Sequence, residues 1–343
     1  MRDILIVSPT SEGLGGVASH VGALASRLSA AGFMVDVISS SNTPIIGLKG
    51  LKNPSFALTS PLKAWRGRWR VVHAHNIPSA TAMRTARAGL KVLTIHGFYS
   101  EQVKFLHGKI LGGIGSWFER KALSWADVIT AVSKNAVEVY RSMGFEVKHI
   151  PNAIDLDTLK YIPKRVKTPQ VVYVGRFSKE KGVDMLLDAS ERARELNFVL
   201  VGSGPLKPLL SRRAAELPNV TVVGPVPHNE ALGYIAGSDV LVLPSRLEGL
   251  STVILEAMAL KTPVVASDVG GNRELVEDGV TGLLVKVGDI EGLVEKIARL
   301  CNDSKLSARL VEEAYKRVKS EYSWSRVFHE YLKVYGLEGD MRS

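Results

Sequence analysis

Residues 239–256 read Asp239-Val-Leu-Val-Leu-Pro-Ser-Arg-Leu-Glu248-Gly-Leu-Ser-Thr-Val-Ile-Leu-Glu256 and predict a buried strand, a loop and the first turns of a helix. The unpaired backbone N–H groups at the start of a helix suit a phosphate. Glu248 and Glu256 flank the turn, where each can accept hydrogen bonds from hydroxyl groups. A ligand with a diphosphate and sugars at both ends would use all three features. In the plainer interpretation, Glu248 is a solvated loop residue and Glu256 favours the early part of a helix.

Similar strand–helix units fill the rest of the 343-residue chain. The predicted strands are short, β-branched and almost continuously apolar, which is typical of strands buried on both faces of a parallel sheet. They are Ile4–Val7, Val35–Ser39, Val71–Ala74, Val92–Ile95, Val128–Val132, Val147–Ile150, Val171–Val174, Phe198–Val201, Val220–Val223, Val240–Leu243, Val264–Ala266 and Leu283–Val285. Strict alternation with helical segments such as Val17–Ala31 and Val183–Leu196 favours doubly wound α/β sheets. Two such domains fit the two groups of strands better than one sheet or a closed eight-stranded barrel.

The division between the two domains is expected near Tyr161–Pro169, a stretch rich in proline and charge. The C-terminal segment Ser323–Gly336 predicts a helix with an aromatic face formed by Trp324, Phe328, Tyr331 and Tyr335. Such a face must pack on another surface, which the first domain could supply. We therefore predict an N-terminal domain of residues 1–163 plus 323–343 and a second domain of residues 164–322.

The composition is that of a globular protein, with 45% apolar residues, 31 glycines and 15 prolines. No apolar run is long enough to predict a membrane span. The N-terminus enters a strand directly and lacks the pattern of a signal peptide. The single cysteine, Cys301, lies in a helical pattern and is expected to pack as an apolar side chain. A cytoplasmic location is the default expectation.

The net charge of +10 is concentrated in one half of the chain. Residues 1–165 hold 21 Lys and Arg against 10 Asp and Glu, and residues 51–100 hold eight basic residues and no acidic one. A basic half attracts nucleic acid, an anionic membrane surface or a phosphorylated substrate. Trp65–Arg70 and Phe98–Leu123 mix cations with aromatic and apolar residues, which suits an interface. The alternatives are an ordinary solvated face over core residues and, from charge alone, a nucleic-acid-binding protein.

A glycine-rich turn, Gly13-Leu-Gly15-Gly16-Val-Ala18, follows the first predicted strand and opens a helix. It matches the dinucleotide-binding pattern only weakly. A NAD site normally has an acidic residue at the tip of the second strand, whereas that strand here ends in Ile38-Ser-Ser-Ser-Asn42. The glycines still allow a ligand to approach the backbone at a helix N-terminus. His20 lies one turn into this helix, where a surface imidazole is the plainer interpretation.

Histidines occur near two predicted strand ends, the edge of an open α/β sheet where ligands bind. His96 follows the strand Val92–Ile95, and His73 and His75 lie near the end of Val71–Ala74. Three histidines suggest a metal, but no acidic residue lies between residues 37 and 100. We therefore expect single hydrogen-bonding roles and no metal.

Arg176 and Lys181 flank the loop that follows the first strand of the second half, in Val174-Gly-Arg-Phe-Ser-Lys-Glu-Lys-Gly182. Two cations at the carboxyl end of a strand suit a diphosphate and offset its charge without a metal. The alternative is a solvated loop of mixed charge. Because the Glu248–Glu256 element is predicted at the same edge of the same sheet, the two elements could converge.

Taken in order, these motifs resemble the family 4 glycosyltransferases. The matching residues are Gly15-Gly16 with His20, Gly175-Arg176 with Lys181-Gly182, and Glu248-Gly249-Leu250 with Glu256-Ala-Met. Val132-Ser133 and Pro151-Asn152-Ala-Ile-Asp155 extend the resemblance over nearly the whole chain, although the family commonly has glycine where Ala153 stands. The resemblance implies the GT-B fold, with two Rossmann-like doubly wound parallel-sheet domains facing across a cleft. It also implies a retaining enzyme that uses a nucleotide-sugar, such as a UDP- or GDP-sugar, without a metal or other cofactor.

The resemblance implies a role for each site residue. Arg176 and Lys181 would bind the donor diphosphate, with Gly175 beside them, and Glu256 would bind the ribose. Glu248 would contact the donor sugar near its C3 hydroxyl, and the backbone of Gly249, Leu250, Ser251 and Thr252 would hold the sugar and phosphate. In the first domain, Gly15 and Gly16 would approach the phosphate and His96 would contact the donor sugar. His20, Ser133 and Asn152 would line the cleft.

The implied chemistry needs no protein nucleophile. Fixed cations and a helix N-terminus stabilise the charge that builds on a leaving diphosphate. Retaining glycosidases need two carboxylates about 5 Å apart, and no such pair with opposed roles is identified here, which agrees with the front-face route usually proposed for the family. The basic half is the acceptor half in this fold, so we expect a lipid-linked or phosphorylated glycan acceptor, reached at the inner membrane face. The alternative is a nucleotide-sugar epimerase or phosphorylase of the same architecture, which turnover without an acceptor would reveal.

Overall fold

The computed structural model describes residues 2–10, 15–48 and 51–340, and these residues fold into two compact α/β units. Unit 1 comprises residues 1–152 and 325–343, and unit 2 comprises residues 153–324. All twelve predicted strands are present, six in each unit, and every recorded pairing between them is parallel. The prediction of two doubly wound parallel sheets is confirmed.

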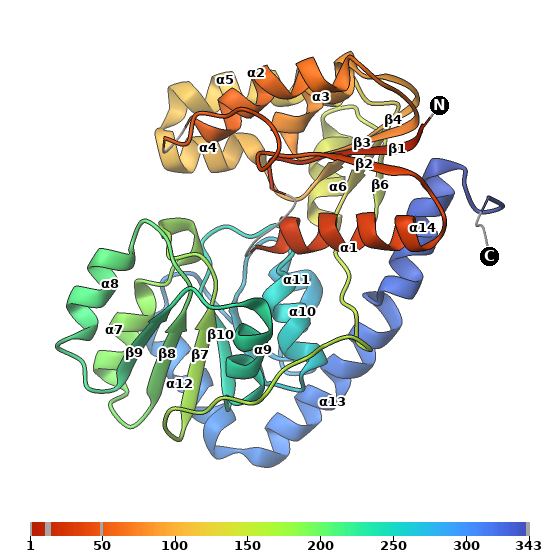
Figure 1. The fold of residues 1–343 in the computed structure, drawn as a ribbon. Helices are drawn as coiled ribbons and strands as arrows, with labels where there is room; N and C mark the ends of the chain where they lie inside the picture. The colour runs from red at the N-terminus through yellow and green to blue at the C-terminus, as the bar shows by residue number, and fades with distance from the viewer. Residues whose placement is uncertain (1, 11–14, 49–50, 341–343) are drawn as a thin grey trace. The chain divides into compact units, whose positions relative to one another are not determined.

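Unit 1, most of whose elements are labelled in Figure 1, contains a sheet with the strand order β2-β1-β3-β4-β5-β6. Its strands are β1 (Arg2–Val7), β2 (Val35–Ile38), β3 (Arg68–His75), β4 (Arg87–Ile95), β5 (Val128–Ala131) and β6 (Val147–His149). Its helices are α1 (Gly16–Ala30), α2 (Lys52–Ala64), the 3₁₀ turn η1 (Ile77–Ser79), α3 (Ala80–Thr85), α4 (Tyr99–His107), α5 (Lys109–Leu123), α6 (Lys134–Ser142) and α14 (Trp324–Tyr335).

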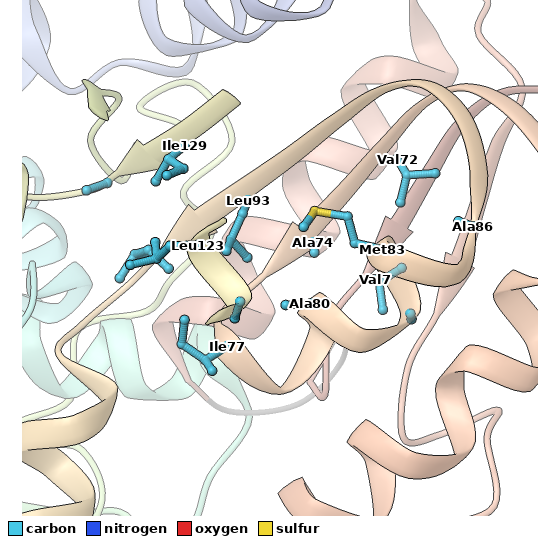
Figure 2. Close-up of a cluster of buried hydrophobic side chains, with 14 of the residues drawn as sticks. Val7, Val72, Ala74, Ile77, Ala80, Met83, Ala86, Leu93, Leu123 and Ile129 are labelled. Carbon is cyan, nitrogen blue, oxygen red and sulfur yellow. The ribbon is translucent and has the colours of Figure 1, made fainter. Parts of the chain in front are cut away.

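Alternating side chains of each strand in unit 1 serve opposite faces of the sheet. Val72 and Ala74 of β3 belong to a buried cluster that includes Ala80 and Met83 of α3 (Figure 2). His73, between those two strand residues, faces the other way and hydrogen-bonds to Tyr335 of α14. The sheet thus lies between a layer that includes α2 and α3 and a layer that includes α14, and its polar side chains face the second layer.

Unit 2 contains a sheet with the strand order β12-β11-β10-β7-β8-β9. Its strands are β7 (Gln170–Val174), β8 (Asn197–Val201), β9 (Val220–Gly224), β10 (Val240–Leu243), β11 (Val264–Ser267) and β12 (Leu283–Val285). Its helical segments are the 3₁₀ turn η2 (Lys179–Lys181), α7 (Met185–Arg192), α8 (Lys207–Ala214), α9 (His228–Ala236), α10 (Thr252–Ala259), α11 (Asn272–Leu275), α12 (Ile290–Asn302) and α13 (Ser304–Glu321). Each residue of β10 is buried, as its uninterrupted apolar sequence predicts.

The contacts divide the chain after Asn152, ahead of the boundary at residue 163 that the Pro- and charge-rich stretch suggests. The reason lies in the backbone of residues 153–164, which pairs with unit 2. Ile154 N–H donates to the carbonyl of Tyr322, and Lys164 N–H donates to the carbonyl of Gly233 in α9. The linker is therefore held along the second unit, although its composition resembles that of a free loop.

The C-terminal aromatic helix packs in the first unit, as its pattern predicts. α14 buries Tyr331 and Tyr335 completely or nearly so, and the rings are stacked with centroids 6.0 Å apart. Cys301 lies in α12 and is half-buried, and burial raises the pKa of its thiol to about 11. In the described residues, no helix is both long and apolar enough to span a bilayer.

Candidate functional site

Two loops meet in unit 2 where the strand order changes direction. β7 and β10 are neighbours, but the chain continues from β7 toward β8 and β9 on one side and from β10 toward β11 and β12 on the other. Ligands of open α/β sheets bind at the carboxyl ends of such strands. The loop after β10 donates two backbone hydrogen bonds to the carbonyl of Glu180 in the loop after β7, from Arg246 at 2.8 Å and Leu247 at 3.2 Å. The predicted convergence of the two loops is thus present within the unit.

Gly182 permits this close approach of the two loops. Its φ of 64° lies in the left-handed region, and a Cβ at this position would lie 2.0 Å from the carbonyl oxygen of Pro244. Every other residue would force the loops apart.

Lys181 and Glu248 form an ion pair across these loops. The Lys181 Nζ donates to both carboxylate oxygens of Glu248 at 2.8 Å, and the Ser245 hydroxyl donates to Glu248 Oε2 at 3.0 Å. The Glu248 side chain is only 8% exposed, whereas that of Lys181 is 28% exposed. Such partners offset the cost of burying a carboxylate. The pair presents one cation and one acceptor side by side at the carboxyl edge of the sheet.

Arg176 adds a second cation to this edge. It follows Gly175, whose N–H donates to the carbonyl of Val201 at 3.0 Å, and its own carbonyl accepts the hydroxyl of Tyr173 at 2.8 Å. The Arg176 side chain is exposed, and the described part of the chain places no carboxylate within ion-pair distance of its guanidinium. An anion that approaches this loop therefore meets a guanidinium that has no counter-ion among the described residues.

The N-terminus of α10 lies beside the ion pair. Ser251 is its N-cap, and its hydroxyl accepts the backbone N–H of Ile254 at 3.3 Å. The preceding backbone packs tightly on the loop after β11, since a Cβ on Gly271 would lie 1.7 Å from the carbonyl oxygen of Gly249. Leu250 and Ser251 are buried, so this loop is fixed by packing. The partial positive charge of the helix start is thus added to the two cations.

Glu256 lies in α10 and is almost completely buried. Its Oε1 is 2.8 Å from Nε2 of His228, the first residue of α9. This hydrogen bond raises the pKa of His228 above its ordinary value. The two acids that flank the turn therefore have different partners, an ammonium for Glu248 and an imidazole for Glu256.

Unit 1 gathers four histidines beside its own change of strand order, between β1 and β3. The ring centroids of His20, His75 and His96 are 5.3–5.9 Å apart, and the His73 and His75 centroids are 4.0 Å apart. Burial lowers the pKa of His73 to about 3 and that of His96 to about 4, and it lowers those of His20 and His75 as well. All four rings are therefore neutral at physiological pH.

Hydrogen bonds tie the four rings to their surroundings. His73 is engaged at both nitrogens, by Tyr335 OH and Thr94 Oγ1 at 2.6 Å each. His75 Nδ1 lies 3.0 Å from His96 Nε2, and His20 Nε2 lies 3.0 Å from Tyr331 OH. Asn152 also hydrogen-bonds to His96 and moderates the fall in its pKa. The sequence pattern groups His20 with the glycine turn, whereas the structure brings it into the histidine cluster.

The cluster bears on the question of a metal. One nitrogen each of His20, His75 and His96 falls within 4.8 Å of the others, so His20 takes the place that the sequence suggests for His73. A ring nitrogen of each is engaged in a hydrogen bond, as is also usual for histidines that bind a metal, and no carboxylate or thiolate joins the group among the described residues. These hydrogen bonds hold His96 in a fixed orientation.

The other residues predicted in unit 1 have local structural partners. Ser133 is the N-cap of α6, and its hydroxyl accepts the N–H of Ala136 at 3.2 Å. Gly15 precedes α1 with a φ of 148°, and no described atom lies within 4 Å of the position where a Cβ would lie, as Gly16 begins the helix. Gly13 lies outside the described residues. Ser133 thus has a structural role that its position after β5 alone does not reveal.

Three residues of the unit 2 site carry no sequence signature. Ser245 and Gly271 act through Glu248 and Gly249, and His228 acts through Glu256. A lone histidine after Pro225-Val-Pro227 looks like a surface residue in sequence. Only the packing of α9 beside α10 makes it a partner of the second acid.

Two doubly wound parallel sheets, each with polar side chains at its carboxyl edge, place the chain in the GT-B class of glycosyltransferases. Residues 158–317 match the family model described as "Glycosyl transferases group 1", and residues 14–158 match that described as "Glycosyltransferase Family 4". The chain belongs to glycosyltransferase family 4, and it is a transferase enzyme.

Relatives and solved structures agree with this placement. The putative teichuronic acid biosynthesis glycosyltransferase TuaC of Bacillus subtilis is 31% identical over 77% of this chain and 70% of its own length. The phosphatidyl-myo-inositol mannosyltransferase of Mycobacterium leprae is 27% identical over 94% and 92%. The sucrose-phosphate synthase structure from Thermosynechococcus elongatus has a TM-score of 0.82 at 24% identity, covering 98% of both chains. The Anabaena Alr3699/HepE structure with UDP-glucose has a TM-score of 0.74 at 19% identity, covering 98% and 100%.

Proposed function

We propose that the protein is a retaining, metal-independent glycosyltransferase. It moves a hexose-type sugar from a UDP- or GDP-sugar to a hydroxyl of a lipid-linked or phosphorylated glycan precursor at a membrane surface. The observation that carries the proposal is the Lys181–Glu248 pair, held beside Arg176 and the N-terminus of α10 at one sheet edge. At that edge, the Lys181 ammonium offers positive charge for a diphosphate and the Glu248 carboxylate offers an acceptor for a sugar hydroxyl. The two groups are hydrogen-bonded to each other at 2.8 Å.

The donor is proposed to lie along the carboxyl edge of unit 2. Lys181 and Arg176 bind the diphosphate, together with the backbone N–H groups at the start of α10. Glu248 accepts a hydroxyl of the transferred sugar near its C3 position, and Glu256 accepts the ribose hydroxyls. From unit 1, His96 contacts the donor sugar and Gly15 and Gly16 approach the phosphate, as the family resemblance implies.

Fixed positive charges give the leaving group its stabilisation. As the bond to the sugar breaks, negative charge builds on the β-phosphate, and the two cations and the helix N-terminus are already in place to receive it. These groups do the work that a divalent cation does in other phosphate sites. The acceptor proton passes to the leaving phosphate on the face where the bond breaks, so the anomeric configuration is retained without a protein nucleophile.

The acceptor is proposed to bind through unit 1 at an anionic membrane. α5 buries Gly112, Gly115 and Glu119 on one face and exposes Ile110, Ile114 and Trp117 on the other. α2 exposes a similar row, Leu58 and Leu62, which ends at Trp65. Lys52, Lys63, Lys109 and Lys121 are exposed on the same two helices. Apolar rows edged by cations suit the boundary of an anionic bilayer.

Within the stretch Trp65–Arg70, the exposed side chains are those of Trp65, Arg66 and Arg68. Trp69 is buried in β3, where its indole N–H donates to Asp36 at 2.7 Å. The two apolar rows and their lysines are therefore the surface on which the membrane proposal rests. The relative from Mycobacterium leprae carries a lipid acceptor in its name, which agrees with a lipid-linked acceptor here.

A thermal-shift panel of UDP-, GDP- and ADP-sugars without added metal tests the donor proposal. One class should raise the Tm of unit 2, and addition of EDTA should leave the shift unchanged. Product analysis by NMR with the stabilising donor should then show the anomeric configuration of the donor in the product. A donor that binds only with a divalent cation, or an inverted product, would contradict the proposal. Release of an epimerised sugar without acceptor would identify an epimerase.

A further inference from the structure

His228 has a placement that the stability of its own helix does not explain. It is the first residue of α9, and the N-cap is Pro227, with no side-chain capping hydrogen bond. A cation at the start of a helix is disfavoured by the helix dipole. The His228 ring nevertheless reaches across to α10, where Nε2 lies 2.8 Å from Glu256 Oε1.

Glu256 depends on this histidine. Its side chain is 12% exposed, and His228 is the hydrogen-bond partner that the described residues provide for its carboxylate. A buried carboxylate without a hydrogen-bond donor is costly. His228 therefore stabilises the buried side chain of Glu256 and holds one of its oxygens in a fixed direction.

Because His228 engages Oε1 of Glu256, Oε2 is the oxygen left to accept hydroxyl groups of a ligand. The His228 side chain is 52% exposed, so the pair lies at the surface of the unit and can be reached by a ligand. It lies on α9 and α10, the helices that follow β9 and β10, so both residues belong to the carboxyl edge where the diphosphate site is proposed.

We propose that His228 is a positioning residue for the nucleotide ribose, holding Glu256 so that its second oxygen accepts the 2′ and 3′ hydroxyls. This inference rests on the proposed function, in which Glu256 is the ribose acceptor. It adds a residue outside the family motifs of this chain and assigns it to one part of the donor. Loss of His228 should weaken ribose recognition without affecting the sugar transfer step itself.

The test compares ligands with and without ribose hydroxyls. UDP, GDP and ADP are titrated calorimetrically against the full chain, and the tightest of them is compared with its 2′,3′-dideoxy analogue. His228→Ala should bind the ribonucleotide about 10-fold more weakly than the unsubstituted chain does, and both proteins should bind the dideoxy analogue equally. In turnover, the donor KM should rise about 10-fold with kcat within about two-fold. His228→Gln, which keeps an N–H donor, should recover most of the affinity.

A matched control is His329→Ala, since His329 is also an exposed histidine paired with a glutamate, Glu338, at 3.3 Å in unit 1. It should leave binding and turnover unchanged. If the His228→Ala protein bound the ribonucleotide as tightly as the unsubstituted chain does, the inference would be overturned and the proposed function would stand. The same would follow if the loss were as large for the dideoxy analogue, since that result indicates a general structural role. If the unsubstituted chain binds none of the three nucleotides, the proposed function fails and the inference fails with it.

Discussion

Glu248 and Glu256 are chemically identical side chains that unit 2 places in different electrostatic surroundings. Glu248 has a permanent cation and a hydroxyl as partners, whereas Glu256 has an imidazole that can change its charge. Both are buried enough that their partners determine which oxygen stays available to a ligand. The different roles proposed for the two acids follow from these partners.

Substitution of Lys181 tests the diphosphate assignment at the scale of one residue. Lys181→Ala should lower kcat/KM at least about 100-fold, because a fixed donor to the developing phosphate charge is lost. Lys261→Ala is the control, since Lys261 forms an exposed pair with Glu312 at 3.3 Å. Steady-state kinetics and donor titration measure both variants.

Loss of Lys181 also leaves Glu248 buried without its cation, so the double variant Lys181→Ala/Glu248→Gln separates folding from binding. Its Tm should recover relative to Lys181→Ala, while its donor affinity should remain low. Full donor affinity and turnover in Lys181→Ala would rule out its role at the diphosphate.

The sequence carries enough information to predict the charged residues of the unit 2 site. Arg176 and Lys181 follow a predicted strand, and both acids flank a predicted helix start, so their common edge can be inferred from parallel-sheet geometry. His228 cannot be found in this way, because its partnership depends on how α9 and α10 pack. The same holds for Gly271, whose need to be glycine is set by the carbonyl of Gly249 on a different loop.

At the scale of elements, the N-cap of α10 contributes both to the stability of the helix and to the proposed phosphate contact. Ser251→Ala removes the acceptor for the Ile254 N–H and should cost about 1 kcal/mol of unfolding free energy. It should also raise the donor KM, because the first turn of α10 is the proposed phosphate contact. Chemical denaturation and kinetics measure the two effects.

Asp303→Ala is the matched control for this helix cap. Asp303 caps α13 and accepts the N–H of Leu306 at 2.9 Å, far along the chain from the loop of the site. Its loss should cost a similar free energy with no change in donor KM. If both variants raised the donor KM equally, the effect would belong to stability and not to the first turn of α10.

The exposed apolar rows on α2 and α5 predict that the protein binds to anionic membranes. The chain should float with vesicles that contain anionic lipid at low salt, and binding should weaken as salt screens the lysines. Replacing Ile110 and Trp117 together with serine should abolish flotation. Ile162→Ser is the control, because Ile162 is 80% exposed and lies in unit 2. Flotation that is unaffected by the double substitution would contradict docking through α5.

The elements themselves could be predicted where burial leaves a regular pattern. All twelve strands contain a short apolar run, which in β10 is completely buried, and the predicted helix at residues 17–31 matches α1. The segment 98–123 is harder to interpret, because α5 carries apolar residues on two faces, one packed in unit 1 and one exposed. Periodicity alone cannot distinguish these two faces, so the helical hairpin emerges only in the structure.

At the scale of the whole molecule, the two units should respond to acid in opposite directions. Folded unit 1 keeps His73 neutral with a pKa of about 3, so the unfolded chain binds more protons below about pH 6.5. The stability linked to this ring is present above that pH and is lost as the pH falls, by about 2 kcal/mol at pH 5. His20, His75 and His96 shift in the same direction. In unit 2 the raised pKa of His228 gives a contribution that is fully present below about pH 6.5 and is lost as the pH rises through the folded value.

Thermal unfolding at pH 7.5 and pH 5 measures this difference. Tryptophan fluorescence should report mainly unit 1, which holds Trp65, Trp69, Trp117 and Trp125. Its transition should fall by about 4–8 °C at pH 5. His73→Asn should reduce this fall, since it removes one titrating ring. A fluorescence transition that stays constant or rises at pH 5 would contradict the neutral histidine cluster.

The Lys181–Glu248 pair has a consequence for product release. Before a donor binds, the pair is neutral, so a free diphosphate must draw the ammonium away from a buried carboxylate. Under the proposed assignment, an intact nucleotide-sugar would offset that loss, because its sugar hydroxyl would give Glu248 a new partner. After transfer of the sugar, the nucleoside diphosphate would keep Lys181 but give Glu248 no new partner. We therefore expect the site to hold the nucleoside diphosphate less tightly than the donor, which would limit inhibition by product.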